Sequence, residues 1–229
     1  MRALEMRSTA LVLFVLLALA LWVASPRPLQ LPAFSAAFLL GGVLIVLGLA
    51  MAQRMSHHPP FRLQRLLAAP ALGAATGAVV LLLLVYGLLP LVPALATRLA
   101  ARAGKPWWFP WAVAIEASVM EEIVFRLFLF TLVLWLCARA WRGTPEAIRP
   151  GWVVTANVVS TLAFAAVHLP SWFAALAPTP GLVAAVLALN CIAGAVMGQI
   201  YWRWGIFPAI AAHFMGDVVV QTFGPRLLG

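Results

Sequence analysis

The stretch from residue 150 to residue 202 holds no Asp, Glu, Lys or Arg, and this absence limits what the chain can fold into. A helix that crosses the hydrocarbon core of a bilayer needs about 20 apolar residues. Turn-forming residues, from Leu169-Pro170-Ser171 to Pro178-Thr179-Pro180, divide the stretch into two apolar halves. Each half is long enough to cross a membrane, so the sequence predicts two spanning helices here.

The composition of the whole chain agrees with a membrane protein. Of 229 residues, 65% are hydrophobic and 9% are charged, and the mean hydropathy is +1.03. Soluble domains are roughly 45–50% apolar and about 25% charged. These values exclude an ordinary soluble fold and a disordered chain, and the absence of apolar–polar alternation excludes an outer-membrane barrel. We therefore expect an all-α fold, a polytopic helical membrane bundle.

Apolar segments along the chain predict about seven spanning helices, or eight if a proline-rich region contains a short one. The third helix should end before Pro90 and Pro93, because proline interrupts helical hydrogen bonding. The predicted spans are 10–24, 33–52, the first part of 66–97, about 107–138, the two helices within 150–202, and 206–223.

The first span shares some features with a secretory signal. Arg2 and Arg7 precede a short apolar run, and Val23-Ala24-Ser25 is loosely similar to a cleavage site. Pro26 directly after this tripeptide argues against cleavage. We therefore expect the first span to be retained.

The formal net charge of +9 comes from fifteen Lys and Arg against six Asp and Glu. These basic residues are scattered between apolar segments, which is typical of loops that face anionic lipid. The expected partner is therefore the lipid bilayer and not nucleic acid. An inside N-terminus would place nine basic residues in inside loops and five outside, which favours that orientation. The preference for Arg over Lys and the abundant Ala indicate a GC-rich bacterial genome, and hence the inner (cytoplasmic) membrane.

The ionisable residues inside the apolar segments carry most of the functional information. A charge at the bilayer centre costs about 2.5–3.5 kcal/mol on insertion scales, so such residues pair, face the bundle interior or line a wet cavity. His57 and His58, by contrast, lie in a polar loop. The acids and histidines within apolar segments are Glu116, Glu121, Glu122, His168, His213 and Asp217.

The segment Glu121-Glu122-Ile123-Val124-Phe125-Arg126 places two acids and a base in one helix. Glu122 and Arg126 are four residues apart, so they share a helical face and can neutralise each other. Glu121 is turned by about 100° from Glu122 and is free to point into a cavity, where a carboxylate can act as a general base. We interpret Glu116 as structural.

Two further polar sites lie on other helices. His168 ends a span just before Pro170, and His213 precedes Asp217 by four residues, so these two share a helical face. Asp217 would either orient the imidazole of His213 or contact a ligand directly. Together with Glu121 these residues are sufficient to activate a water molecule and to stabilise an oxyanion.

Small residues within the apolar segments have a simpler interpretation. Cysteine in such a segment behaves as a small hydrophobic residue, and glycines four residues apart let helices approach closely in lipid. The residues that we interpret as helix-packing residues are Cys137, Cys191, Gly73, Gly77, Gly194 and Gly198.

The three polar motifs, in this order on separate helices, resemble the CPBP family of CAAX proteases and bacteriocin-processing enzymes, also called the abortive-infection family. The motifs are Glu121-Glu122-x-x-x-Arg126, Phe164-x-x-x-His168 and His213-x-x-x-Asp217, and the resemblance covers about residues 107–224. It implies a catalytic membrane core at 107–229 behind N-terminal transmembrane helices and loops at 1–106, within one integral domain.

The resemblance also implies a role for each motif residue. Glu121 and His168 would activate the hydrolytic water. His213 and Asp217 would assist the oxyanion, and Glu122 with Arg126 would brace the site. The eukaryotic prenyl-protein enzymes have Asn where this chain has Asp217, and an anionic group is a poor oxyanion donor unless protonated. Asp217 is therefore also expected to orient His213.

The sequence is compatible with either zinc-dependent or metal-free hydrolysis. Two His and a carboxylate are able to hold Zn²⁺ with an open position for water. No His-Glu-x-x-His element is present, however, and the resemblance favours a glutamate-dependent hydrolysis without a cofactor. We expect the metal-free mechanism and retain zinc as the alternative.

The sequence thus predicts an intramembrane endopeptidase that hydrolyses a peptide bond of a membrane-anchored protein or peptide. Because bacteria generally lack prenylated CAAX substrates, we do not assume a literal CAAX activity. One alternative is a non-catalytic membrane protein for self-immunity or maturation. Another is a proton-coupled transporter with Glu121 and His168 as a relay, which would predict matching repeats that the sequence does not contain.

Overall fold

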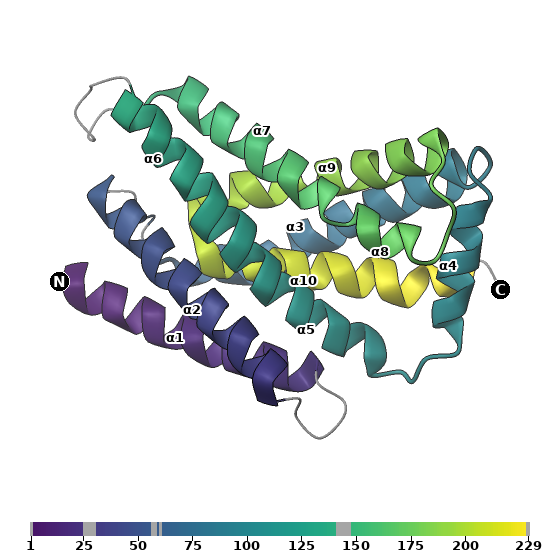
Figure 1. The fold of residues 1–229 in the computed structure, drawn as a ribbon, viewed down its shortest axis with the longest axis horizontal. Helices are drawn as coiled ribbons and strands as arrows, with labels where there is room; N and C mark the ends of the chain where they lie inside the picture. The colour runs from purple at the N-terminus through teal and green to yellow at the C-terminus, as the bar shows by residue number, and fades with distance from the viewer. Residues whose placement is uncertain (1, 25–30, 56–58, 60, 141–147, 228–229) are drawn as a thin grey trace.

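The computed structural model describes residues 2–24, 31–55, 59, 61–140 and 148–227. Within these ranges the chain is helical and contains no strand, which confirms the expected all-α fold (Figure 1). Ser25, Pro26, His57 and His58, on which parts of the sequence analysis depended, lie outside the described residues.

Seven helical segments of the described chain are long and apolar enough to cross a membrane, as the sequence predicts. Each predicted span corresponds to one of these segments. They are Glu5–Val23, Ala33–Arg54, Leu63–Leu88, Phe109–Ala140, Pro150–Phe173, Pro180–Trp204 and Ile206–Leu227.

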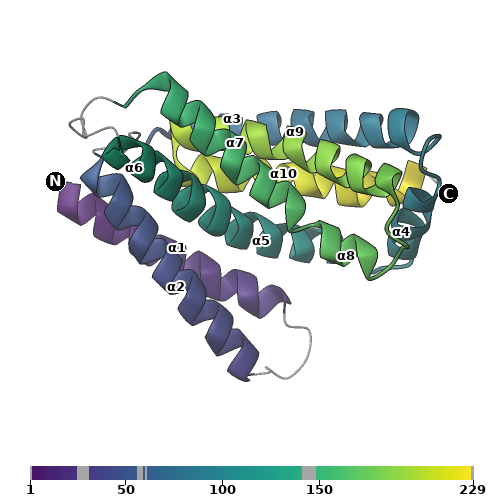
Figure 2. The same ribbon diagram turned by 45° about the horizontal axis from the view of Figure 1, so that its top comes forward.

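The first two spans form an antiparallel pair, which we call the N-terminal hairpin. It consists of α1 (Arg2–Ala24) and α2 (Leu31–Arg54), and Leu17 and Ile45 are fully buried within its packing. The hairpin contacts α5 and the segments that continue it. Away from these contacts it diverges from the rest of the bundle (Figure 2).

The third span ends where the prolines predict. Helix α3 (Leu63–Leu82) continues as a π-helical segment, η1 (Leu83–Leu88), and stops before Pro90 and Pro93. The sequence analysis did not predict the next helix, α4 (Ala94–Ala103), which is too short to span a membrane. Figure 1 shows α4 lying across one end of the bundle.

The fourth span is one continuous helix with a π-helical centre. It consists of α5 (Phe109–Glu121), η2 (Glu122–Phe130) and α6 (Thr131–Ala140). π-Helical geometry is rare and is frequently found at functional sites. At the end of η2, the hydroxyl of Thr131 donates to the carbonyl of Arg126, five residues earlier, at 3.3 Å. The expected boundary between residues 106 and 107 falls in the turn that leads into α5, and the division into two parts stays a prediction.

The break predicted around residues 169–180 is present. Helix α7 (Pro150–Ala166) is followed by the short α8 (Leu169–Phe173) and then by α9 (Pro180–Trp204). The Thr179 hydroxyl accepts a hydrogen bond from the Leu182 amide and so caps α9. Gly205, with φ of 96°, provides the reversal into α10 (Ile206–Phe223), which the turn η3 (Pro225–Leu227) follows.

Helices α3 and α10 approach each other through glycines. A Cβ atom at Gly73 would overlap the backbone carbonyl of Ala212, and one at Gly77 would lie 2.5 Å from the carbonyl oxygen of Gly216. Close backbone approach of this kind is how small residues pack helices in lipid. Because His213 and Asp217 directly follow these two contact residues, the glycines of α3 help to position the third motif.

Candidate active site

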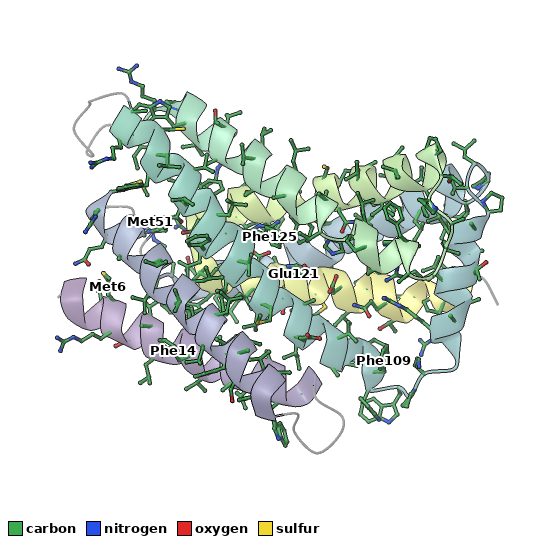
Figure 3. All side chains as sticks on the ribbon, in the orientation of Figure 1. Met6, Phe14, Met51, Phe109, Glu121 and Phe125 are labelled. Atoms are coloured by element: carbon green, nitrogen blue, oxygen red, sulfur yellow. The ribbon has the colours of Figure 1, made fainter. Side chains whose placement is uncertain are left out.

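The three motifs converge although they are far apart in the sequence. Glu121 ends α5, His168 lies between α7 and α8, and His213 lies inside α10. Figure 3 labels Glu121 near the middle of the molecule, where the α5–η2 helix passes α10. Each of the six motif residues has a polar atom within 4 Å of another motif residue.

Glu121 lies between the two histidines. Its Oε1 atom is 3.8 Å from Nε2 of His168, and its Oε2 atom is 3.6 Å from Nε2 of His213. Both distances exceed a direct hydrogen bond. Its side chain is 25% exposed and Oε2 has no hydrogen-bond partner among the described residues. The carboxylate therefore faces both imidazoles without a direct hydrogen bond to either.

The backbone of α7 determines the orientation of His168. Its Nδ1 atom is 2.7 Å from the carbonyl oxygen of Phe164, and since a carbonyl only accepts, Nδ1 carries the hydrogen. In the neutral ring Nε2 is then the unprotonated nitrogen, and this is the atom that faces Glu121. The four-residue spacing of Phe164 and His168 thus corresponds to a hydrogen bond that fixes the tautomer.

Glu122 is fully buried and joins two partners. Its Oε1 atom is 3.3 Å from Nη1 of Arg126 and accepts a 2.8 Å hydrogen bond from Nδ1 of His213. The Arg126 guanidinium, also fully buried, donates to the carbonyl of Gly194 and lies 4.4 Å above the Phe164 ring. The pairing of Glu122 with Arg126 is therefore present, and it extends to the third motif.

Asp217 lies on the other side of the His213 ring. Its Oδ1 atom is 3.9 Å from Nε2 of His213, and its Oδ2 atom accepts a 3.4 Å hydrogen bond from Gln221. The shortest contact to the imidazole thus comes from Glu122 and not from Asp217. Gln221 was not selected in the sequence analysis, although its position one helical turn after Asp217 is a signal for such a pair.

Gly194 supports the site more directly than its interpretation as a packing residue implied. A Cβ atom here would lie 3.1–3.4 Å from Thr161, Phe164 and the Arg126 guanidinium, closer than ordinary contact. Because the glycine has no side chain, the guanidinium can reach its carbonyl. The residue therefore acts through helix packing and through a hydrogen bond to the buried ion pair.

The remaining residues within apolar segments lie apart from these contacts. Glu116 is half-buried, and no hydrogen bond or ion pair joins it to another residue of the described chain. Cys137 and Cys191 are partly exposed and are not joined in a disulfide. In the described structure none of the three forms a hydrogen bond or an ion pair with a motif residue.

A resident zinc ion would need at least three protein ligands that converge on one point. Across the described residues no three His, Cys, Asp or Glu side chains converge as metal ligands.

A family model of the Rce1-like type II CAAX prenyl endopeptidases matches residues 103–219, just over half of the chain. The match includes all three motifs. The chain belongs to this family. It is the CPBP family that the motifs resembled, so that prediction is confirmed. A comparison with curated proteins and one with solved structures gave no match. With its seven apolar helices, this Rce1-like chain is an integral multi-pass membrane protein of a protease family.

Proposed function

We propose that the protein is an intramembrane endopeptidase in which Glu121 is the general base. One observation carries this proposal. Of two adjacent acids, Glu122 is buried in an ion pair, whereas Glu121 is partly exposed and lies between two imidazoles. An acid in that position has the freedom to take up and return a proton.

In the first step a water molecule is activated. Glu121 Oε1 and His168 Nε2 are 3.8 Å apart, a separation that one water spans with hydrogen bonds of about 2.8 Å to each atom. Glu121 removes a proton while the water oxygen bonds to the peptide carbonyl carbon. The carbonyl electron pair moves to the oxygen, which gives a tetrahedral oxyanion.

The third motif, His213 with Asp217, assists this oxyanion. His213 donates through Nε2 when its ring carries both protons, since Nδ1–H is already bonded to Glu122. The buried carboxylate of Glu122 supplies the counter-charge for that state, and Arg126 in turn neutralises Glu122. Asp217, at 3.9 Å from Nε2, keeps the imidazole in place from the other side.

In the last step the intermediate collapses. Glu121 returns its proton to the peptide nitrogen, the oxyanion electron pair re-forms the carbonyl, and the carbon–nitrogen bond breaks. The products are a carboxylic acid and an amine, and transfer of the acid's proton to the amine gives a carboxylate and an ammonium group. The water is the only co-reactant, so the reaction needs neither a nucleophilic side chain nor a redox partner. Zinc-dependent hydrolysis remains the alternative that chelation distinguishes.

The substrate would be a membrane-anchored protein or peptide. The polar cluster lies within spanning helices, so the scissile bond must enter the bilayer or lie at its surface. We further propose the bacterial inner membrane as the location, on the basis of the basic-residue distribution and the Arg- and Ala-rich composition. A substrate that is anchored in the same bilayer meets the site by lateral diffusion.

The test compares three alanine variants in proteoliposomes. A mixture of N-palmitoylated peptides of diverse sequence is incubated with the wild type, Glu121→Ala, His168→Ala and Glu116→Ala, and new termini are identified by mass spectrometry. We expect cleavage by the wild type to fall by at least about 10²–10⁴-fold in the Glu121 and His168 variants. Glu116→Ala removes a half-buried acid of the same helix and should stay within about twofold of the wild type.

Full activity in both Glu121→Ala and His168→Ala would refute the proposal. All variants must first insert and elute as one folded species, so that loss of activity is not loss of fold. A wild type that cleaves no peptide, in this mixture or in membranes of its own host, would favour the non-catalytic immunity or maturation role.

A further inference from the structure

The short helix α4 carries its charges on an unusual face. Leu95 and Leu99 are buried, and Thr97 and Ala101 are exposed. Arg98 and Arg102 lie on the half-buried flank between these two faces. A helix at a membrane surface ordinarily turns its charged residues outward, so here the two arginines face the protein instead.

The Arg98 guanidinium reaches the segment that follows the second motif. It stacks 4.2 Å above the Trp172 ring, and its Nη2 atom donates to the Ser171 hydroxyl at 3.2 Å. That hydroxyl donates to the carbonyl of His168 at 2.8 Å. The other terminal nitrogen, Nη1, is buried and has no hydrogen-bond partner among the described residues.

Arg102 lies one turn further along α4, close enough to both Arg98 and Asp217 to interact with their charges. Burial lowers the pKa of both guanidiniums. For Arg98 the positive charge of Arg102 lowers the pKa further, whereas for Arg102 the carboxylate of Asp217 opposes the effect of burial. Within the described part of the chain neither guanidinium forms an ion pair.

We propose that Arg98 and Arg102 bind a carboxylate of the substrate next to the scissile bond. The proposal rests on the endopeptidase function proposed above. Two like charges on one half-buried helix flank repel each other, and a bound anion removes this cost. The guanidinium fork matches the geometry of a carboxylate, with which it forms two parallel hydrogen bonds.

The carboxylate has two possible sources in a peptide substrate. It is either the chain's C-terminus, a few residues beyond the cleaved bond, or an Asp or Glu side chain. A lipid phosphate would need the arginines on the outer face of α4, which instead presents Thr97 and Ala101. The inward contacts with Trp172 and Ser171 therefore favour the substrate over the lipid headgroup.

The experiment measures binding to the Glu121→Gln variant, which cannot turn a substrate over. The probes are fluorescent apolar hexapeptides with a free C-terminus, with a C-terminal amide, or with an amide and one internal Asp. In nanodiscs of neutral phosphatidylcholine, the two probes with a carboxylate should bind about 10–100-fold more tightly than the neutral amide. Which of the two binds better identifies the source.

Two charge-neutralising double variants in the Glu121→Gln background make the comparison specific. Arg98→Gln/Arg102→Gln should abolish the preference for the carboxylate probes. Lys105→Gln/Arg226→Gln removes two exposed positive charges, one just after α4 and one in η3, which contacts α4, and should keep the preference within about twofold. Arg98→Lys/Arg102→Lys retains the charge and should retain part of the preference, which separates binding from misfolding.

Equal affinity for acid and amide probes would overturn the proposal, as would an equal loss of preference in the Lys105/Arg226 variant. A preference that disappears when phosphatidylglycerol is added would assign the arginines to lipid phosphate and also overturn it. Because binding needs no hydrolysis, the two proposals fail separately. Cleavage without a carboxylate preference refutes only the arginine site, and a preference without any cleavage refutes only the endopeptidase function.

Discussion

The N-terminal hairpin and the fourth span are both strongly apolar, yet they differ in how much of each is enclosed. Within an apolar stretch of 18 residues in each span, 22% and 28% of the residues are buried in the two hairpin helices, against 44% in the span Phe109–Ala140. Large apolar side chains such as Leu39 and Leu40 remain exposed on the hairpin, as expected for a lipid-facing helix. The fourth span instead buries Glu122 and Arg126 completely.

This difference shows what a membrane bundle needs in order to hold charge. A buried ion pair costs desolvation energy that only good geometry and further hydrogen bonds offset. The fourth span is surrounded by α2, α7, α9 and α10, which supply the Gly194 carbonyl and the His213 imidazole. The hairpin packs mainly against one side of the bundle, so it has no comparable enclosure (Figure 2).

The largest effect should come from the same substitution made in each region. Glu122→Gln leaves the Arg126 guanidinium buried without its counter-charge and should lower the free energy of unfolding by about 3–5 kcal/mol. Glu5→Gln, on an exposed position of α1, should change it by less than about 0.5 kcal/mol. SDS titration in mixed micelles, followed by tryptophan fluorescence, measures both.

A third variant separates charge from packing in this comparison. Glu122→Gln/Arg126→Met also removes the buried guanidinium charge, so it should recover part of the unfolding free energy that Glu122→Gln loses. Cleavage should be absent in the double variant, because both residues that brace the site are replaced. Equal stability of the Glu122 and Glu5 variants would mean that enclosure does not distinguish the two regions.

Glycine substitutions give a smaller effect that tests the packing itself. At Gly73 a new methyl group meets the Ala212 backbone, which cannot move without shifting α10, so Gly73→Ala should destabilise by about 1–3 kcal/mol. At Gly42, in the hairpin, it meets only the tip of the Phe14 ring, at 2.8 Å. Since this side chain can rotate and alanine favours helix, Gly42→Ala should be neutral within about 1 kcal/mol.

The two glycine variants are compared by the same SDS titration and by peptide cleavage. Gly73→Ala should also reduce cleavage, because α10 carries His213 and Asp217. If Gly42→Ala proved the more damaging substitution, the hairpin would be as tightly packed as the core.

The smallest effect is expected from metal removal. Because no three potential ligands converge in the described structure, a strong chelator should leave the cleavage rate within the error of the assay. Loss of activity that zinc restores would contradict this expectation. It would also mean that the buried polar side chains of the site bind a metal ion.

Many features of the fold could be predicted because they depend on residues close together in the sequence. The predicted span 206–223 coincides with α10, and the third span ends before Pro90 as expected. The amphipathic helix α4 and the π-helical segment η2 were not predicted. Helix α4 is too short and too polar for a hydropathy criterion, and a π-helix has no composition of its own.

In the candidate site, too, contacts between nearby residues were predicted and contacts between distant residues were not. Local spacing correctly placed Glu122 beside Arg126. It did not reveal that Glu122 also accepts a hydrogen bond from His213, 91 residues later. That contact requires the packing of α10 against η2, which no local pattern specifies.

The sequence by itself determined that this chain crosses the membrane about seven times and that, apart from Glu116, the acids and histidines selected within its apolar segments fall on three motifs. Both follow from the cost of placing charge in hydrocarbon, which acts on each segment separately. Only the tertiary structure decided which acid is fully buried and which stays partly exposed, and which flank of α4 faces the protein. These depend on contacts between helices distant in the sequence, where shape complementarity and hydrogen-bond geometry select one arrangement.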